Sequence, residues 1–418
     1  MSGGTAPKSA IVIGAGMVGL ATAWHLQERG VDVTVLDREG VAAGSSWGNA
    51  GWLTPALTMP IAEPSVLAYG AKTLMSSTSP IYVPLRPNRD LLRFLVGFAR
   101  HCTPAKWREA MSVFTVLSRI SIEAYDELSD GGVKARPVPA DPFIAGFSSE
   151  LARDILVKEF DHATELGGSV DYDLISGTDL RALEPLLAEG TTEGILIKGQ
   201  RFINPGDYVN ALADAVRSRG GEIVTDALVT RIDDRGRDSV AVGTADGRKW
   251  TADTIVLATG TWLGKLARQF GVKAVVQAGR GYSFSVRTDT PAKHPIYFPA
   301  QRVACTPLGD RLRVSGMMEF RPPGAPLDQR RIQAIVNAAK PMFEGIDWDS
   351  RHDEWVGSRP CTADGLPLVG QTRSKRVYVA GGHGMWGIAL GPLTGRLLAD
   401  EMTGAPRPAI LNRLNPLR

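Results

Sequence analysis

Three glycines near the start of the chain have the spacing of a dinucleotide-binding turn. The segment GAGMVG places Gly14, Gly16 and Gly19 after an apolar run, and Met17 opens a helical pattern. The first glycine of such a turn allows a tight bend. The second lets the backbone approach a pyrophosphate, and the third lets the helix pack on the sheet. Because a helix N-terminus also supplies amide donors, this segment predicts a phosphate cradle.

A carboxylate follows at the distance that a ribose requires. Asp37 ends the next apolar run, eighteen residues after Gly19, where it can accept hydrogen bonds from both ribose hydroxyls. Its charge would repel the 2′-phosphate of NADP, so these residues alone leave NAD and FAD open. The cradle is the first of two regions with residues suited to chemistry.

The second region lies near the other end of the chain, where an arginine precedes a glycine-rich turn. Arg359 stands in GSRPCTADGLPLVG, and GGHGMWG occupies residues 381–387. A guanidinium matches a carboxylate through two parallel hydrogen bonds. No HExxH or paired CxxC spacing occurs, so we predict no metal site.

The elements that must position these residues alternate between two kinds of structure. Parallel-sheet signals are the strand–helix–strand run 9–39, the buried strands 254–258 and 375–382, and a closing helix over 393–402. Between them lie the helical patterns 89–101, 111–129 and 150–166, and the alternating segment 272–320. We therefore predict an α/β fold in which a discontinuous Rossmann-like domain is interrupted by an antiparallel-sheet α+β domain. The expected boundaries are 1–80, 196–268 and 345–418 for the first, and 81–195 with 269–344 for the second.

Bulk composition excludes several classes of protein. The 418 residues are 44% hydrophobic and 22% charged, and the net charge of +3 is too small to favour nucleic acid as a partner. Three separated cysteines predict reduced thiols rather than disulfides. The apolar stretch 10–26 is interrupted by three glycines and a histidine, so we expect no transmembrane segment. We expect a cytoplasmic protein and leave open peripheral contact with the inner face of a membrane.

The segment AAGSSWGNAGWLTP (42–55) favours FAD over NAD. It resembles the flavin-contacting stretch of the D-amino acid oxidase and glycine oxidase superfamily, and is especially similar to bacterial D-amino acid dehydrogenases of the small-subunit type. Further segments continue the resemblance in order, namely SPIYVPLRP, VLATGTWLGKL, GRGYSFSV, RVSGMMEF, WVGSRPCTADGLPLVGQT and GGHGMWGIALGP. The resemblance implies a Rossmann-like FAD-binding domain, a substrate domain and non-covalent FAD.

The resemblance also implies a reaction and an FAD site. The reaction is oxidative deamination of a D-amino acid to a 2-oxo acid and ammonia, with hydride transfer from the α carbon to flavin N5. Electrons then pass to a quinone, another carrier or oxygen. The residues expected at FAD are Gly14, Gly16, Met17, Gly19, Asp37, Arg38, Ser45, Ser46, Asn49, Ala50, Gly51, Trp52, Leu53, Val229, Thr259, Gly260, Trp262, Gly382, His383, Gly384, Met385, Trp386 and Gly387.

Fewer residues are expected at the substrate. Arg359 matches the family's Arg-Pro signature and is expected to hold the carboxylate, with Tyr282 or Tyr297 adding a hydroxyl. Met385 and Trp386 stand where related dehydrogenases carry a threonine-rich turn, so we expect them to shape the pocket. His383 is a candidate base, although its place between glycines favours a backbone contact with the flavin.

Other functions stay open at this point. Within the class, the substrate can be glycine, sarcosine, D-proline or hydroxyproline. A non-catalytic flavin subunit of a larger oxidoreductase complex is a further alternative. An NAD-dependent dehydrogenase would use the same strand–helix–strand unit, but the glycine segments at 259–260 and 381–387 argue against it.

Overall fold

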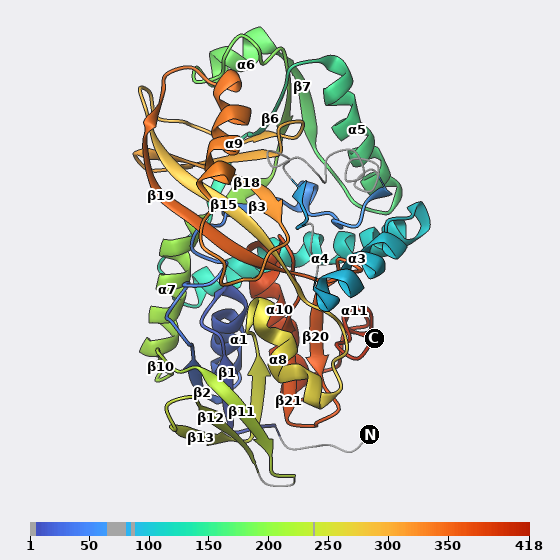
Figure 1. Cartoon of the computed structure of the whole chain (residues 1–418), viewed down its shortest axis with the longest axis vertical. Helices are drawn as coiled ribbons and strands as arrows, with labels where there is room; N and C mark the ends of the chain where they lie inside the picture. The colour runs from blue at the N-terminus through green and yellow to red at the C-terminus, as the bar shows by residue number, and fades with distance from the viewer. Residues whose placement is uncertain (1–5, 65–80, 85–87, 237–238) are drawn as a thin grey trace.

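The computed structural model describes residues 6–64, 81–84, 88–236 and 239–418. Two sheets dominate it, one in each half of the molecule as drawn in Figure 1. The lower half holds the N-terminal strand–helix–strand unit together with the C-terminal strands and helix, so both ends of the chain build one layer. The upper half holds the larger, mainly antiparallel sheet. This arrangement confirms the predicted fold class.

The lower sheet has six strands, and all neighbours but the last pair run parallel. Across the sheet they are β10 (Glu222–Val224), β2 (Asp32–Leu36), β1 (Ser9–Ile13), β14 (Thr254–Leu257), β21 (Val377–Gly381) and β20 (Leu368–Gln371). In β1, Ala10 and Val12 point to one hydrophobic cluster whereas Ile11 and Ile13 point to another. Both faces are therefore covered, which explains why this strand is apolar throughout.

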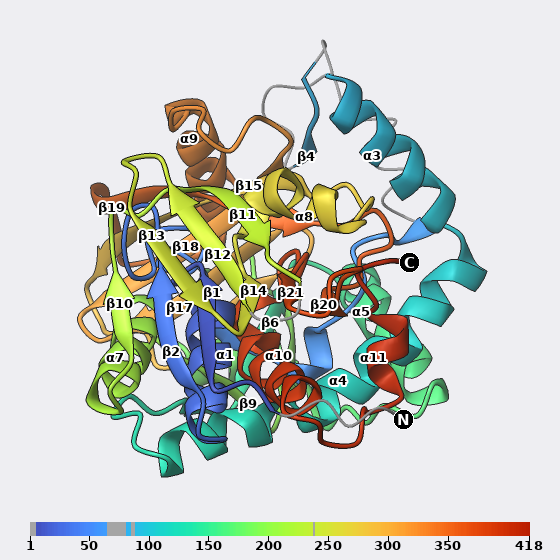
Figure 2. The same ribbon diagram turned by 90° about the horizontal axis from the view of Figure 1, so that it is seen from below.

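Helices cover one face of this sheet and a small sheet covers the other (Figure 2). The helices are α1 (Met17–Gln27), α4 (Pro104–Asp130), α7 (Pro205–Ser218) and α10 (Gly387–Met402). The small sheet is formed by β11 (Val229–Asp234), β12 (Val240–Thr244) and β13 (Lys249–Ala252). α10 lies close against α1, because a Cβ at Gly395 would stand 2.6 Å from the carbonyl carbon of Ala21.

The upper sheet has nine strands among the described residues. Its main path runs through β19 (Ile346–Cys361), β15 (Gln277–Thr288), β18 (Arg311–Glu319), β17 (Val303–Leu308), β16 (Ile296–Phe298), β6 (Phe143–Phe147), β8 (Glu193–Ile197) and β7 (Tyr172–Ser176), with β4 (Ile81–Tyr82) beside β18. The pairs are antiparallel except β16 with β6 and β4 with β18.

The other elements surround these two sheets. A second small sheet joins β3 (Trp52–Leu53), β9 (Gln200–Phe202) and β5 (Val138–Ala140). The remaining helices are α3 (Arg89–His101), α5 (Glu150–Glu165), α6 (Gly177–Leu183), α8 (Leu263–Ala267), α9 (Gln329–Ala339) and α11 (Ile410–Arg413). Short 3-10 helices span Pro55–Leu57, Gly260–Trp262, Arg268–Phe270 and Lys340–Met342.

The closing helix begins six residues earlier than the sequence predicts. We expected it to start after Pro392, because proline lacks the N–H that a helix interior requires. In the structure Pro392 lies inside α10, and the Tyr125 hydroxyl donates to the carbonyl of Ile388, four residues earlier, at 2.7 Å. A side chain from α4 thus supplies the donor that proline lacks.

The domain boundaries stay a prediction. The six-stranded sheet draws on the segments assigned to the FAD-binding domain, but β19 pairs with β15 in the other sheet although 345–418 is assigned to the first domain. Much of the SPIYVPLRP motif lies outside the described residues.

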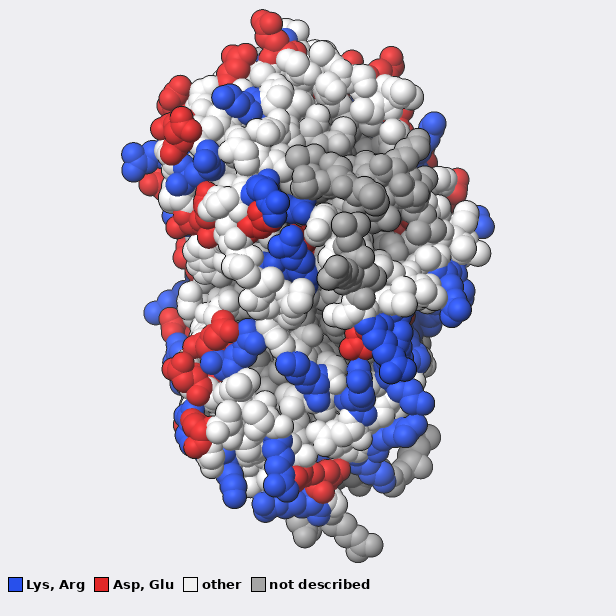
Figure 3. Space-filling view, in the orientation of Figure 1, with Lys and Arg blue, Asp and Glu red and all other residues white. Residues whose placement is uncertain are grey.

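Charged side chains are unevenly spread over the face shown in Figure 3. Lys and Arg are frequent on its lower half, whereas Asp and Glu gather along its left edge and top. The small net charge is thus the balance of local surpluses. In the part of the chain that the structure describes, no helix is long and apolar enough to cross a membrane.

Candidate active site

The N-terminal glycine turn brings three elements into backbone contact. Gly14 has a φ of +118°, and a Cβ there would stand 2.4 Å from the carbonyl oxygen of Ala258, at the end of β14. A Cβ at Gly19 would stand 1.9 Å from the carbonyl oxygen of Gly14. Neither position has room for a side chain. The backbone of the turn therefore lies close to the sheet, with the amino end of α1 directly above it.

The ribose-binding candidate Asp37 lies at the edge of this turn. One carboxylate oxygen accepts from the Ala15 amide at 2.8 Å, and the other accepts from the amides of Glu39 and Gly40 at 2.8 and 2.9 Å. A carboxylate offers about four acceptor positions, so one is still free for a ribose hydroxyl. Beside it, the Arg38 guanidinium lies 3.5 Å from the centre of the Trp262 ring, a cation–π contact.

The loop that follows β2 closes over the start of α1. Ser46 Oγ accepts from the Met17 amide at 3.2 Å, which leaves the hydroxyl hydrogen available to donate. Asn49 Oδ1 accepts from the Gly51 amide at 2.8 Å and so shapes its own turn. Gly51 is required here, because its φ is +80° and a Cβ would stand 2.1 Å from the Ile203 carbonyl oxygen.

Four hydrogen bonds tie this loop to the nine-stranded sheet, one of them from Arg313 on β18 to the Trp47 carbonyl at 2.7 Å. Ser283 on β15 donates to the Gly48 carbonyl at 2.8 Å, and Thr306 on β17 donates to the Ala50 carbonyl at 2.7 Å. The Trp52 indole in turn donates to Thr306 at 2.9 Å. One face of the sheet therefore lies against the loop expected to contact the flavin.

The C-terminal glycine turn faces the same space from α10. His383 is buried, its Nε2 lies 2.9 Å from Thr394 Oγ1, and burial lowers its pKa to about 4. Its imidazole is therefore neutral at pH 7 and engaged with a residue of the helix that follows it. The Trp386 indole donates to the Met59 carbonyl at 2.8 Å. This bond fixes the side chain against the segment that follows the 3-10 helix Pro55–Leu57.

These loops meet around one pocket. It is lined by Arg359 and by eleven residues predicted at the cofactor, namely Gly16, Met17, Gly19, Ser45, Ser46, Asn49, Gly260, His383, Gly384, Met385 and Gly387. Residues 343 positions apart in the chain, such as Gly16 and Arg359, therefore share one site. The spatial meeting of the two glycine turns was not visible in local sequence.

Other predicted cofactor residues do not line this pocket. They are Gly14, Asp37, Arg38, Ala50, Gly51, Trp52, Leu53, Val229, Thr259, Trp262, Gly382 and Trp386. Leu53 is only 1% exposed and packs in the main hydrophobic cluster, and Val229 is buried at the start of β11. Their contact with a cofactor stays a prediction.

Arg359 is half-buried at the pocket and has no acidic partner. Its Nη1 donates to the Met317 carbonyl at 2.6 Å and lies 3.9 Å from the Met318 sulfur. Among the described residues no carboxylate forms an ion pair with it, and burial lowers its pKa. A guanidinium loses hydration in such a place and requires an anion in return.

The structure does not bring Tyr282 to Arg359, and the predicted hydroxyl contact there has to be corrected. Successive residues of a strand point to opposite faces. Ser283 faces the loop that follows β2 and is expected to contact the flavin. The Tyr282 hydroxyl instead donates at 2.6 Å to Glu319 on the other face of the sheet. Glu319 also pairs with Arg280, and both are fully buried.

Tyr297 lies on the face with Ser283, but it does not line the pocket. Cross-strand register joins Ser283, Ser315, Ala304 and Tyr297 in one row. The Tyr297 ring meets Trp52 edge-on at 5.4 Å, and burial raises its pKa to about 12. Its role toward a substrate stays a prediction.

The residues fit FAD on structural grounds. The turn at Gly14 and Gly19 has no space for side chains, and amides at the start of α1 point to the pocket as a pyrophosphate requires. At the carboxyl end of β14, the hydroxyls of Thr259 and Thr261 are buried without a partner among the described residues. Buried hydroxyls normally have partners, so these two suit a ligand with several polar atoms.

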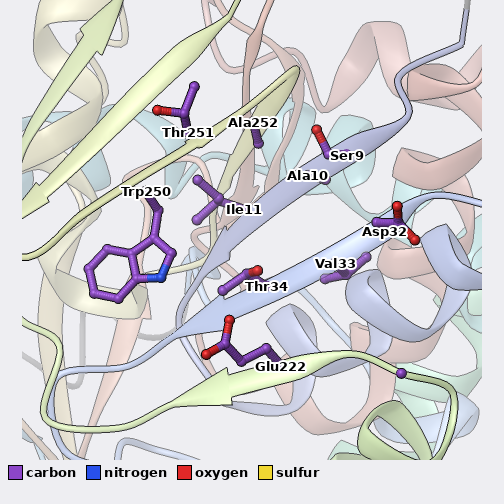
Figure 4. Close-up of a pocket in the computed structure, with 11 residues that line it drawn as sticks. Ser9, Ala10, Ile11, Asp32, Val33, Thr34, Glu222, Trp250, Thr251 and Ala252 are labelled. Atoms are coloured by element: carbon purple, nitrogen blue, oxygen red, sulfur yellow. The ribbon is translucent and has the colours of Figure 1, made fainter.

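A second pocket lies at the opposite end of the parallel strands (Figure 4). It is lined by the first residues of β1 and β2, by Glu222 on β10 and by Trp250 on β13. Ligands of open parallel sheets bind beyond the carboxyl ends of the strands. The pocket with Arg359 satisfies this rule and the second pocket does not.

The three cysteines and the acidic residues do not form a metal centre in the described part of the chain. Cys102, Cys305 and Cys361 are all buried and free. Burial raises the pKa of Cys361 to about 12, so its thiol is protonated and unreactive at neutral pH.

Three residues with a place in the site were missed by sequence reasoning. The Trp355 ring packs on Gly48, Gly281 underlies the Arg359 guanidinium, and Met317 supplies its carbonyl acceptor. Glycines inside a strand pattern indicate close approach of another group, so GRGYSF contained a usable signal. The contribution of Met317 depends on backbone geometry and left no such signal.

Comparison with known proteins agrees with this architecture. A family model described as DAO, FAD dependent oxidoreductase, matches residues 9–401. Glycine oxidase from Geobacillus kaustophilus is 22% identical, with a TM-score of 0.73 and coverage of 99% of this chain and 98% of its own. L-proline dehydrogenase from P. horikoshii has 14% identity, the same TM-score and the same coverage.

The name of a third similar protein indicates a different kind of substrate. L-α-glycerophosphate oxidase from Mycoplasma pneumoniae, solved with FAD bound, is 16% identical with a TM-score of 0.71 and covers 95% of each chain. At these identities the likeness shows the fold. The choice of substrate has to be argued from side chains.

Proposed function

We propose a substrate class for a chain that belongs to the DAO family of FAD-dependent oxidoreductases: it oxidises an amino acid at its carbon–nitrogen bond. The observation that carries the proposal is Arg359, a half-buried guanidinium that lines the pocket and has no acidic partner among the described residues. A substrate carboxylate would supply the missing anion through two charge-assisted hydrogen bonds.

Arg359 holds and orients the substrate in this proposal. With its carboxylate fixed, the substrate has few ways to turn, and the α C–H is held toward the glycine-lined part of the pocket. FAD, when bound, would supply the hydride acceptor. Loss of the hydride turns the neutral amine into an iminium, which water hydrolyses to a 2-oxo acid and ammonium. His383 is not the base in this scheme, because its imidazole is buried and engaged with Thr394, and a pKa lowered to about 4 makes it a weak proton acceptor.

The cofactor would be held by three groups of residues. The turn at Gly14–Gly19 with the start of α1 would take the pyrophosphate, and Asp37 the ribose. The turn at Gly384–Gly387 would bring backbone amides to the isoalloxazine ring. We expect no covalent link, since the thiol of Cys361 is buried and protonated.

Within this class we propose a D-amino acid as the substrate and a quinone, another carrier or oxygen as the electron acceptor. Glycine, sarcosine, proline and hydroxyproline form the second group of candidates. The second group is supported by the fold shared with glycine oxidase and L-proline dehydrogenase.

Anaerobic reduction of the purified yellow protein tests the proposal. Each candidate is added without oxygen, and loss of the flavin absorbance near ~450 nm is followed. We expect bleaching by at least one amino acid and none by glycerol 3-phosphate, which lacks an amine and a carboxylate. If the panel of D-amino acids, glycine, sarcosine and both prolines leaves the absorbance unchanged, amino acid oxidation is wrong. Readmitting oxygen, or adding a quinone, then identifies the acceptor by the return of absorbance.

A further inference from the structure

The guanidinium of Arg359 lies flat on a glycine of the neighbouring strand. A Cβ at Gly281 would stand 2.2 Å from Nη2, 2.3 Å from Cζ and 2.6 Å from Nη1 of Arg359. All three distances are far below van der Waals contact, so any other residue at this position would displace the whole head group. Gly281 therefore sets the height of the guanidinium above the sheet.

A bulge in the next strand holds the same head group from one side. Arg280 pairs with Glu319 and Tyr282 with Gly316, so two residues of β18, Met317 and Met318, stand opposite the single residue between them. Met317 has a φ of +67°, a left-handed conformation that is uncommon for a side chain of this size. In this conformation its carbonyl accepts from Arg359 Nη1 at 2.6 Å.

Together the two contacts leave one edge of the guanidinium open. The Met317 carbonyl accepts a hydrogen bond from one N–H of Nη1, and Gly281 blocks movement of the Arg359 guanidinium toward the sheet. The N–H groups on Nε and Nη2 have no hydrogen-bond acceptor among the described residues. Bulges often re-aim groups beside active sites, and backbone strain tends to occur where function requires it.

We infer that Gly281 and the Met317 bulge are positioning residues that aim the Nε–Nη2 edge of Arg359 at the substrate carboxylate. The inference rests on the proposed function, since it gives Arg359 the carboxylate. It adds that affinity for carboxylates depends on two residues that touch neither substrate nor cofactor. Both act by setting the plane and the rotation of the Arg359 guanidinium.

The test compares binding of acetate and its neutral analogue acetamide by calorimetry on the FAD-loaded protein. In Gly281→Ala we expect acetate to bind about tenfold more weakly or worse, because one of two charge-assisted hydrogen bonds is lost. Acetamide should bind as in the unmodified protein. KM for the amino acid substrate should rise in parallel with a smaller change in kcat. Gly243→Ala is the matched control, since it is also in a strand and its nearest neighbour would be 3.8 Å away.

Met317 provides a second pair of variants in case Gly281→Ala folds poorly. Met317→Gly keeps the carbonyl and tolerates a φ of +67°, so acetate affinity should stay within about twofold. Met317→Val is β-branched and disfavours that conformation, so acetate affinity should fall. A role in folding alone would lower the melting temperature of both variants and leave the acetate-to-acetamide ratio constant.

Arg359→Leu separates failure of this inference from failure of the proposed function. If Arg359→Leu abolishes acetate binding but Gly281→Ala and Met317→Val leave it intact, the positioning role is wrong and the carboxylate site stands. If Arg359→Leu also binds acetate normally, the carboxylate site itself is wrong.

Discussion

Two arginines on adjacent strands, Arg280 on β15 and Arg359 on β19, lie on opposite faces of the same sheet and have opposite surroundings. Arg280 is fully buried, pairs with Glu319 at 3.2 Å and donates to the carbonyls of Ala325 and Pro326. Arg359 is half-buried beside a pocket and has one backbone acceptor. A buried guanidinium requires acceptors, so the first has found them within the protein whereas the second is left to find one in a ligand.

The comparison separates a stabilising cluster from a proposed binding site. Around Glu319 gather Arg280, Arg321, Arg331 and the Tyr282 hydroxyl, all on the side of α9. Around Arg359 gather glycines, which offer space instead of partners. Changes on the first face should therefore alter stability, and changes on the second should alter substrate binding.

The largest effect is expected from Glu319→Gln. Removing this charge leaves Arg280 and Arg331 buried without their carboxylate, and breaking a buried ion pair costs about 3–5 kcal/mol. Urea unfolding should show a loss of this size. Asp214→Asn, in the exposed pair with Arg217, is the control and should change stability by less than about 1 kcal/mol. Equal losses for both variants would contradict the structural role of the cluster.

Arg359→Leu should have the reverse profile. We expect kcat/KM for the amino acid substrate to fall about a hundredfold or more, because a charge-assisted pair with the carboxylate is lost. Stability should change by less than about 1 kcal/mol, since Arg359 has no acidic partner in the described structure. Steady-state kinetics and urea unfolding measure the two quantities. A large loss of stability with unchanged kinetics would reverse the assignment of the two arginines.

A third prediction concerns His383, which is on the pocket side but engaged within the protein. Burial lowers its pKa from 6.5 to about 4. The unfolded chain then binds more protons than the folded one between these values, so this residue's contribution is full above pH 6.5 and is lost as pH falls toward 4. It amounts to about 2 kcal/mol between pH 7 and pH 5.

Unfolding curves at the two pH values check this. His383→Gln should lose less stability than the unmodified protein on going from pH 7 to pH 5. Part of the acid sensitivity should persist, because burial lowers the pKa of His25 to about 3. An unchanged pH dependence in the variant would indicate that His383 is protonated in the folded protein and therefore exposed to a charge or to solvent.

The smallest effect is expected from Tyr282→Phe. Loss of the hydrogen bond to Glu319 should cost about 1–2 kcal/mol, since the acceptor is charged and buried. KM should stay the same, because the hydroxyl is on the face away from Arg359. A rise in KM with unchanged stability would return Tyr282 to the substrate site that the sequence alone suggests.

The parts of the site that could be predicted depend on local spacing. Gly14, Gly19 and Asp37 lie within one strand–helix–strand unit, where the same few residues form the turn and its contacts. The fold class followed from the same periodic patterns. The start of α10 was missed because the donor that compensates for Pro392 is Tyr125, some 270 residues away.

The residues of this chain by themselves determined where a nucleotide cofactor is expected, because glycine spacing and the turn after a buried strand are local properties of the backbone. The sequence also singled out Arg359, but tertiary structure alone decided that Arg280 has an acidic partner and that Arg359, among the described residues, has none. Alternation along β15 sends Tyr282 and Ser283 to opposite faces, and only sheet packing determines which face meets α9 and which meets the flavin loop. Arg280 is neutralised and Arg359 is left without an acid for that reason.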